Sequence, residues 1–131
     1  MKVLLISVDG YVSLGIRYIS AKLKEAGHKV KLVFFPYTRT QSYPRKILIR
    51  LKELSSNSEF IGISSMAYSS KKAIQIALHL KSLGVPIIWG GVFPTVCPES
   101  CLEYVDTVHI GEGEESMLDL INIYLNGIKN E

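Results

Sequence analysis

The sequence predicts an α/β fold with a central parallel sheet, and three observations lead to this prediction. Five short apolar stretches alternate with segments whose apolar residues recur at helical spacing, which is typical of parallel strands joined by helices. The first stretch, Val3–Val8, is a continuous run that is apolar except at Ser7, as expected of a strand that is covered on both faces. The stretch Val85–Trp89 ends abruptly in Gly90 and Gly91, which indicates a strand end without side chains.

A first helix and an edge strand follow the first strand. Ile16, Ile19 and Leu23 recur at helical spacing, and Gly27 then ends the helix at its C-terminal cap. The second strand, Lys29–Phe35, begins by alternating lysines with apolar residues, which predicts an edge strand with one wetter face.

The middle of the chain contains a second helix and a third strand. After a polar segment rich in Tyr and Thr, we expect a helix over Arg45–Leu54. Its apolar stripe is expected at Ile47, Leu51 and Leu54. The third strand, Phe60–Ser64, has Gly62 inside it, and a glycine within a strand often marks the close approach of another group.

The remaining elements complete the alternation. A third helix opens at Ser69, and its apolar face is expected at Ala73, Ile76, Ala77, Leu80 and Leu83. After the glycine pair we expect a short helix over Pro98–Tyr104, a fifth strand over Thr107–Ile110 and a final helix over Glu115–Leu125. The 131 residues contain no internal repeat and have the length of one domain.

Right-handed crossovers between these strands give the sheet order 2-1-3-4-5. This is the order of a flavodoxin-like (Rossmann-like) three-layer sandwich with a five-stranded parallel sheet. The loops expected together at the carboxyl edge of this sheet are residues 9–15, 64–69, 90–95 and 111–113. They are rich in Gly, Ser and Thr and poor in Lys and Arg, so we expect a neutral, backbone-lined site suited to a large ligand.

Charge and hydropathy exclude several classes of function. The net charge of +3 is too small to indicate nucleic-acid binding, and the lysines are spread over several predicted helices. No apolar run is long enough to span a membrane. The apolar start is like that of a signal peptide, but Asp9 and Gly10 cut it short, so we interpret it as a strand and expect a cytoplasmic protein.

Three motifs follow one another at the predicted strand ends: the run Phe60–Met66, the pair Gly90–Gly91 with Thr95, and the loop Gly111–Glu114. In this order they resemble the cobalamin (vitamin B12)-binding domain at the N-terminus of radical S-adenosylmethionine enzymes. The resemblance covers nearly the whole chain and implies that residues 1–131 form a single cobalamin-binding domain of a longer radical S-adenosylmethionine protein. Such a domain binds cobalamin at the C-terminal edge of the sheet and presents it to the catalytic domain, in cis or in trans, for methyl transfer.

The resemblance also implies a set of cofactor contacts. The nucleotide tail of cobalamin enters a groove in the domain, where Ser64 and Ser65 contact it and Gly90 and Gly91 leave space for it. The corrin faces the catalytic domain. The full set of residues expected to bind the cofactor is Asp9, Gly10, Tyr11, Val12, Leu14, Ser64, Ser65, Met66, Gly90, Gly91, Val92, Phe93, Thr95, Gly111, Glu112 and Gly113.

Two departures from the family pattern affect the site. Domains that ligate cobalt through histidine carry Asp-x-His-x-x-Gly after the first strand, whereas Asp9 is followed here by Gly10, with no histidine in the loop. The resemblance therefore implies base-off cobalamin without a histidine ligand, and an apolar lower face would ease transfer of an upper methyl group. The residues expected beneath the cobalt are Tyr11, Val12 and Leu14. Phe93 stands where related sequences often have histidine after the Gly-Gly pair.

The chain lacks the residues of a radical enzyme. Cys97 and Cys101 imitate the start of a Cys-x-x-x-Cys-x-x-Cys run, but Tyr104 takes the third position, and two thiolates do not complete the ligand set of an iron–sulfur cluster. The cluster and S-adenosylmethionine are therefore expected only in the catalytic domain. No metal ligands and no nucleophile–base pair converge in the sequence, so this domain alone is not expected to be an enzyme.

Other functions of this architecture fit less well. A phosphoacceptor domain needs an acidic cluster and a lysine at the strand ends, and Ser64 and Ile110 stand in two of these places. A dinucleotide site needs Gly-x-Gly-x-x-Gly after the first strand, which is absent. The alternative that stays open is a flavodoxin-like regulatory or interaction module that binds no cobalamin. Ser64 and Ser65 are equally compatible with capping the next helix, and Glu112 and Glu114 with a solvated loop or a docking surface.

Overall fold

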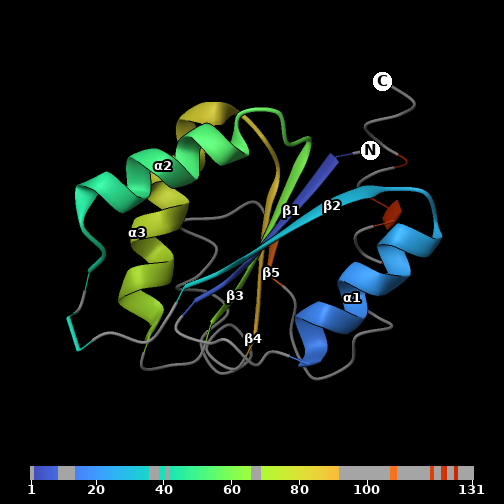
Figure 1. The fold of residues 1–131 in the computed structure, drawn as a ribbon, viewed down its shortest axis with the longest axis horizontal. Helices are drawn as coiled ribbons and strands as arrows, with labels where there is room; N and C mark the ends of the chain where they lie inside the picture. The colour runs from blue at the N-terminus through green and yellow to red at the C-terminus, as the bar shows by residue number, and fades with distance from the viewer. Residues whose placement is uncertain are drawn as a thin grey trace.

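The fold is a three-layer α/β sandwich, seen in a computed structural model of the chain (Figure 1). Helix α1 covers one face of the sheet, and helices α2 and α3 cover the other. The structure describes residues 2–8, 14–35, 39–40, 42–65, 69–91, 107–108, 119, 122–123 and 126. The strands are β1 (Lys2–Ser7), β2 (Lys29–Phe34), β3 (Phe60–Ser65), β4 (Ile87–Gly91) and β5 (Thr107–Val108). The helices are α1 (Leu14–Glu25), α2 (Arg45–Ser55), α3 (Ser70–Leu80) and the 3-10 turn η2 (Lys81–Leu83).

All strand pairs are parallel, and the order in the sheet is β2-β1-β3-β4-β5. The predicted flavodoxin-like α/β fold and the order of the first four strands are therefore confirmed, and β2 is an edge strand as expected. The fifth strand was expected over Thr107–Ile110, but the described part is a two-residue segment, Thr107–Val108, paired with β4. Within the described residues, the sheet thus has four full strands and a short fifth pairing instead of five full strands.

The two faces of the sheet form two separate apolar cores. Leu4 and Ile6 of β1 belong to the core under α2 and α3, together with Trp89 of β4. Val3 and Leu5 of the same strand belong to the core under α1. Residues 3–8 are all buried, which confirms that the first apolar run is a central strand covered on both sides.

Helix α2 differs from the sequence prediction in its buried stripe. Ile47 is 40% exposed, whereas Leu48 and Leu51 are 6% and 2% exposed. The stripe continues at Ser55, which is fully buried and whose hydroxyl donates to the carbonyl of Leu51 at 2.7 Å. Leu48, Leu51 and Ser55 follow one another at spacings of three and four residues and form the buried stripe, and the exposure of Ile47 places it at the edge of that stripe.

Glycines explain two local features of the fold. Gly27 and Gly84 have φ values of 94° and 68°, which confirms their predicted use as stops after helical segments. Inside β3, a Cβ on Gly62 would lie 2.8 Å from Leu5 Cδ2, so the predicted close approach is that of a side chain from the neighbouring strand.

In the described part of the chain, no helix combines the length and apolar character that crossing a bilayer requires.

Candidate functional site

The carboxyl ends of the central strands meet at one edge of the sheet, as the sequence predicted. Ser7 of β1 lies opposite Ser64 of β3, and Ser64 lies opposite Gly90 of β4. Leu5 lies two residues before Ser7 on β1, and Ile88 lies two residues before Gly90 on β4. Both belong to the core under α1. Because side chains alternate along a strand, Ser7, Ser64 and Gly90 share that α1 side. We call these three residues the small-residue row.

The small-residue row places no large side chain across three neighbouring strands. Ser7 is 4% exposed, and Ser64 is half-buried. The strand ends remain hydrogen-bonded beneath the row, since the Val8 amide donates to the Ser64 carbonyl at 3.0 Å. The row therefore offers the half-buried Ser64 hydroxyl and strand ends without large side chains, which suits a ligand lying against strand ends.

An aromatic residue closes the β2 end of this row. Phe34 pairs with Ser7 and is the last residue of β2. The guanidinium carbon of Arg17, from the first turns of α1, lies 4.6 Å from the centre of the Phe34 ring. Such a contact uses the face of the guanidinium and holds the arginine beside the carboxyl edge.

Ser65 has a different environment from Ser64. Its hydroxyl accepts a hydrogen bond from the indole Nε1 of Trp89 at 2.7 Å. Trp89 is fully buried and Ser65 is 3% exposed, so the bond lies inside the core under α2 and α3. Sequence reasoning missed this bond, although a lone tryptophan in a buried strand signals that its N–H needs a partner nearby.

The helix-capping alternative for the two serines is excluded by the structure. Both belong to β3, and the N-cap of α3 is Ser69. Gly90 and Gly91 are likewise strand residues, paired with Ser64 and Ser65. Among the described glycines, positive φ values occur at Gly27 and Gly84 and not in the Gly90–Gly91 pair. The pair therefore matters because it has no side chains, and not because its backbone angles are unusual.

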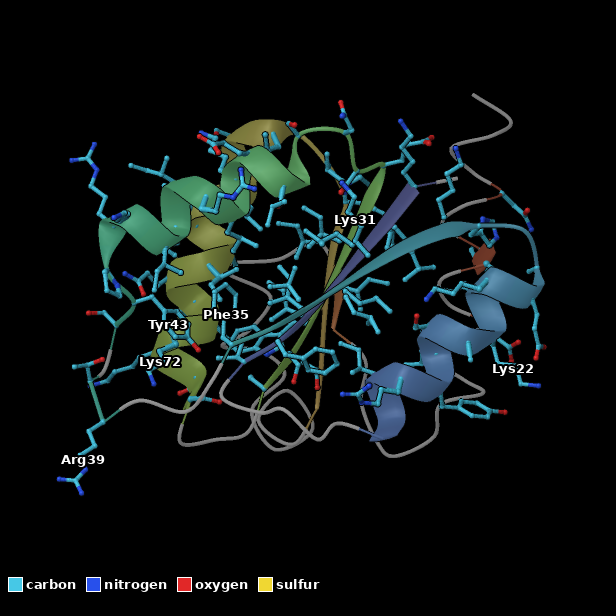
Figure 2. All side chains as sticks on the ribbon, viewed as in Figure 1. Lys22, Lys31, Phe35, Arg39, Tyr43 and Lys72 are labelled. Atoms are coloured by element: carbon cyan, nitrogen blue, oxygen red, sulfur yellow. The ribbon has the colours of Figure 1, made fainter. Side chains whose placement is uncertain are left out.

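A second group of residues at the same edge was not predicted. Phe35 follows β2, Tyr43 precedes α2, and their rings stack with centroids 4.7 Å apart. Gln75 of α3 accepts from the Tyr43 amide at 2.8 Å and donates to the Tyr43 carbonyl at 3.2 Å. The Lys72 ammonium lies 5.2 Å from the centre of the Tyr43 ring. We call Phe35, Tyr43, Lys72 and Gln75 the Tyr43 cluster; Figure 2 shows three of its members side by side.

Many of the predicted cofactor-binding residues lie outside the described residues. These are Asp9, Gly10, Tyr11, Val12, Met66, Val92, Phe93, Thr95, Gly111, Glu112 and Gly113. Leu14 is the first residue of α1, and only its backbone is described. The structure thus brings together Ser64, Ser65, Gly90 and Gly91 of the predicted set, and the lower face of the cobalt stays a prediction.

Among the described residues, the titratable group with a shifted pKa lies away from this edge. His28 precedes β2 and therefore lies at the opposite, amino-terminal edge of the sheet. Burial lowers its pKa from the usual value of 6.5, and the positive charge of the amino terminus lowers it further. In the described part of the chain, no three His, Cys, Asp or Glu side chains gather into a possible metal site.

Comparison with known proteins identifies the family. Residues 1–121 match the B12 binding domain. Among solved structures, a novel cobalamin-binding protein from Desulfitobacterium hafniense DCB-2 matches 94% of this chain with a TM-score of 0.69 and 18% identity. The chain spans 58% of the length of that protein. A 3-dehydroquinate dehydratase-like protein from Bifidobacterium longum matches 95% of this chain and 98% of its own length, with a TM-score of 0.58 and 14% identity.

At these identities the structural matches show a common fold and no more. No curated protein matches the chain. The family match covers the sheet, the small-residue row and the Tyr43 cluster, and it extends over most of the sequence. The chain therefore belongs to the B12-binding domain family.

Proposed function

We propose that this domain binds cobalamin at the carboxyl edge of its sheet, with the nucleotide tail lying along the small-residue row. The observation that carries the proposal is the row itself, in which Ser7, Ser64 and Gly90 face the α1 side of three adjacent strands. A tail with an aromatic base and a ribose needs small side chains beneath it together with polar partners, and the row combines small side chains with the Ser64 hydroxyl. Family membership supports the same ligand.

The two adjacent serines have separate roles in this proposal. Ser64 is half-buried and faces the row, so its hydroxyl is the one offered to the tail. Ser65 faces the other core and holds the indole of Trp89. The Ser65–Trp89 bond joins the carboxyl ends of β3 and β4. It thereby keeps Ser64 of β3 opposite Gly90 of β4.

The mode of cobalt ligation is a second part of the proposal. The loop after β1 contains no histidine, so we infer base-off cobalamin with no histidine ligand from this chain. When bound, cobalamin supplies a cobalt centre suited to methyl transfer. Electron paramagnetic resonance of the cob(II)alamin form tests this point, because hyperfine splitting from a protein nitrogen would contradict it.

The partner is a third part of the proposal. The motifs resemble the N-terminal domain of radical S-adenosylmethionine enzymes, and the chain itself contains only two cysteines. We therefore propose that a radical S-adenosylmethionine catalytic domain, in cis or in trans, holds the iron–sulfur cluster and receives the cofactor presented here. We also propose that the domain works in the cytoplasm.

Two corrinoids test where the tail lies. Cobinamide lacks the nucleotide tail and is otherwise closely similar to cobalamin. Ser64→Leu places bulk in the row, and we expect it to weaken hydroxocobalamin binding at least on the order of tenfold, since even one misplaced methylene in a fitted site is worth that much. Cobinamide binding should change little. Ser82→Leu makes the same substitution at an exposed position of η2 and is the matched control.

The outcomes separate the proposal from its alternative. Binding is measured by co-elution on gel filtration and by a shift of the corrin absorption bands. Loss of cobalamin affinity in Ser64→Leu alone, with cobinamide unaffected, supports the tail position. Equal loss for both corrinoids would contradict it. Free cobalamin at high concentrations of the wild-type protein would favour an interaction module that binds no cobalamin.

A further inference from the structure

We propose that Arg17 binds the phosphate of the cobalamin tail and so sets the direction in which the tail lies along the small-residue row. This inference rests on the proposed function, and it adds to the site a residue of α1 that the sequence did not indicate. In this orientation the aromatic base of the tail lies at the Gly90 end of the row, and the phosphate lies at the Phe34 end.

Arg17 lies next to the small-residue row. Phe34 pairs with Ser7 in the register of β1 and β2, and its side chain packs against the core under α1. Phe34 therefore continues the row by one strand on the same side of the sheet. The guanidinium carbon of Arg17 lies 4.6 Å from the centre of the Phe34 ring, which brings a positive charge to this end of the row.

The rest of this edge is poor in positive charge. Lysine and arginine are absent from the segments expected at the carboxyl edge, which are residues 9–15, 64–69, 90–95 and 111–113. The other basic residues of α1 are Lys22 and Lys24, and both belong to its last turn, which leads to the opposite edge of the sheet. Among the described residues on the α1 side, Arg17 is therefore the basic residue at the carboxyl edge.

An arginine in this place suits the chemistry of the tail. The phosphodiester is the charged group of the tail, and moving it from water to a neutral edge costs free energy unless a cation pairs with it. A guanidinium group binds phosphate through two N–H groups, and it also stacks on aromatic rings. The Phe34 ring is half-buried and belongs to a strand, so it holds the arginine beside the row.

The spacing of the strands fits this orientation. Neighbouring strands lie about 4.8 Å apart, so Phe34 of β2 and Gly90 of β4 are separated by about 14 Å across the sheet. This distance is on the scale of one nucleotide. Gly90 has no side chain to compete with the flat base, and Ser64 lies between the two ends of the row, in the position of the ribose.

Arg17→Met tests the phosphate contact, because it removes the charge and keeps much of the aliphatic stem. We expect its dissociation constant for hydroxocobalamin to rise on the order of 5- to 30-fold, the worth of a charge-assisted hydrogen bond that solvent partly screens. Arg17→Lys keeps the charge and should lose less. Cobinamide lacks the nucleotide and its phosphate, so its binding should change little in either variant.

Lys22→Met is the matched control. It removes a basic residue from the same helix, and the Lys22 ammonium also lies over an aromatic ring, 5.6 Å from the centre of Tyr18. Hydroxocobalamin should bind this variant as it binds wild type. Affinities are measured at a temperature where thermal melts show every variant to be fully folded.

Two further readouts distinguish a phosphate contact from a general change in the site. Added salt should weaken hydroxocobalamin binding to wild type, and this dependence should be smaller in Arg17→Met, because the screened ion pair is gone. The phosphorus NMR signal of bound cobalamin should differ between wild type and Arg17→Met. The same signal should not move in Lys22→Met.

The outcomes separate this inference from the proposed function. Weaker hydroxocobalamin binding in Arg17→Met, with cobinamide binding and Lys22→Met unaffected, supports the inference. Unchanged hydroxocobalamin affinity in Arg17→Met would overturn it and leave the proposed function standing. Equal losses for both corrinoids would also overturn it, because Arg17 would then not act on the phosphate. Wild-type protein that takes up neither corrinoid would instead refute the proposed function, and the inference with it.

Discussion

Replacing Ser65 by alanine is expected to destabilise the fold through Trp89. The substitution removes the acceptor of the indole N–H, which lies 2.7 Å from the Ser65 hydroxyl. Trp89 is fully buried and Ser65 is 3% exposed, so water has no path to replace the lost partner. A buried donor left unpaired costs about 1–3 kcal/mol. For a domain of this size the melting temperature should fall by about 4–12 °C.

The neighbouring serine supplies the control for this experiment. Ser64 is half-buried and faces the opposite side of β3. Ser64→Ala should therefore change the free energy of unfolding by less than about 0.5 kcal/mol. Urea denaturation followed by far-UV circular dichroism measures both variants on the same scale. Equal stability of Ser65→Ala and Ser64→Ala would refute the reasoning.

A double-mutant cycle separates the hydrogen bond from other effects of the substitution. Trp89→Phe removes the N–H together with part of the ring. In that background Ser65→Ala should cost almost nothing, because no donor is left unpaired. The coupling between the two sites should be roughly 1–2 kcal/mol. A coupling near zero would show that Ser65 stabilises the fold by some other contact.

Three further predictions follow from the fold. Gly62→Ala should lower the free energy of unfolding by about 1–3 kcal/mol, because its Cβ would lie 2.8 Å from the buried Leu5 side chain; an unchanged urea midpoint would contradict this. Leu48→Ala should cost about 2–4 kcal/mol and Ile47→Ala less than about 1, since only Leu48 is buried; the reverse order would contradict the observed stripe. The pKa of His28 is lowered in the fold, so the unfolded chain binds its proton more readily. Stability should therefore decrease as the pH falls below about 6.5, and melts of His28→Gln should show a smaller decrease than wild type.

The sheet could be predicted from the sequence because its signals are local. The run at residues 3–8 is apolar except at Ser7, and the glycine pair ends β4 where the apolar run stops. Sheet order follows from crossover handedness, which depends on topology and not on particular side chains. The carboxyl edge could therefore be placed, together with Ser64 and Gly90, before any contact was known.

What could not be predicted depends on contacts between distant residues. The Trp89–Ser65 bond spans 24 positions in the sequence, and the Gln75–Tyr43 pair spans 32. Lys72 looks like any charged residue in the first turn of a helix, and its contact with the ring of Tyr43 is visible only in the folded chain. The stripe of α2 was misplaced because Ile47 and Leu48 are both apolar and only packing decides between them.

Amide hydrogen exchange with and without hydroxocobalamin tests the central claim most directly. If cobalamin settles on the strand ends, exchange should slow at Ser64–Ser65 and Gly90–Gly91, while the amino-terminal edge around His28 stays unchanged. Slowed exchange at the amino-terminal edge alone, or an exchange pattern that the corrinoid leaves unaltered, would contradict the account.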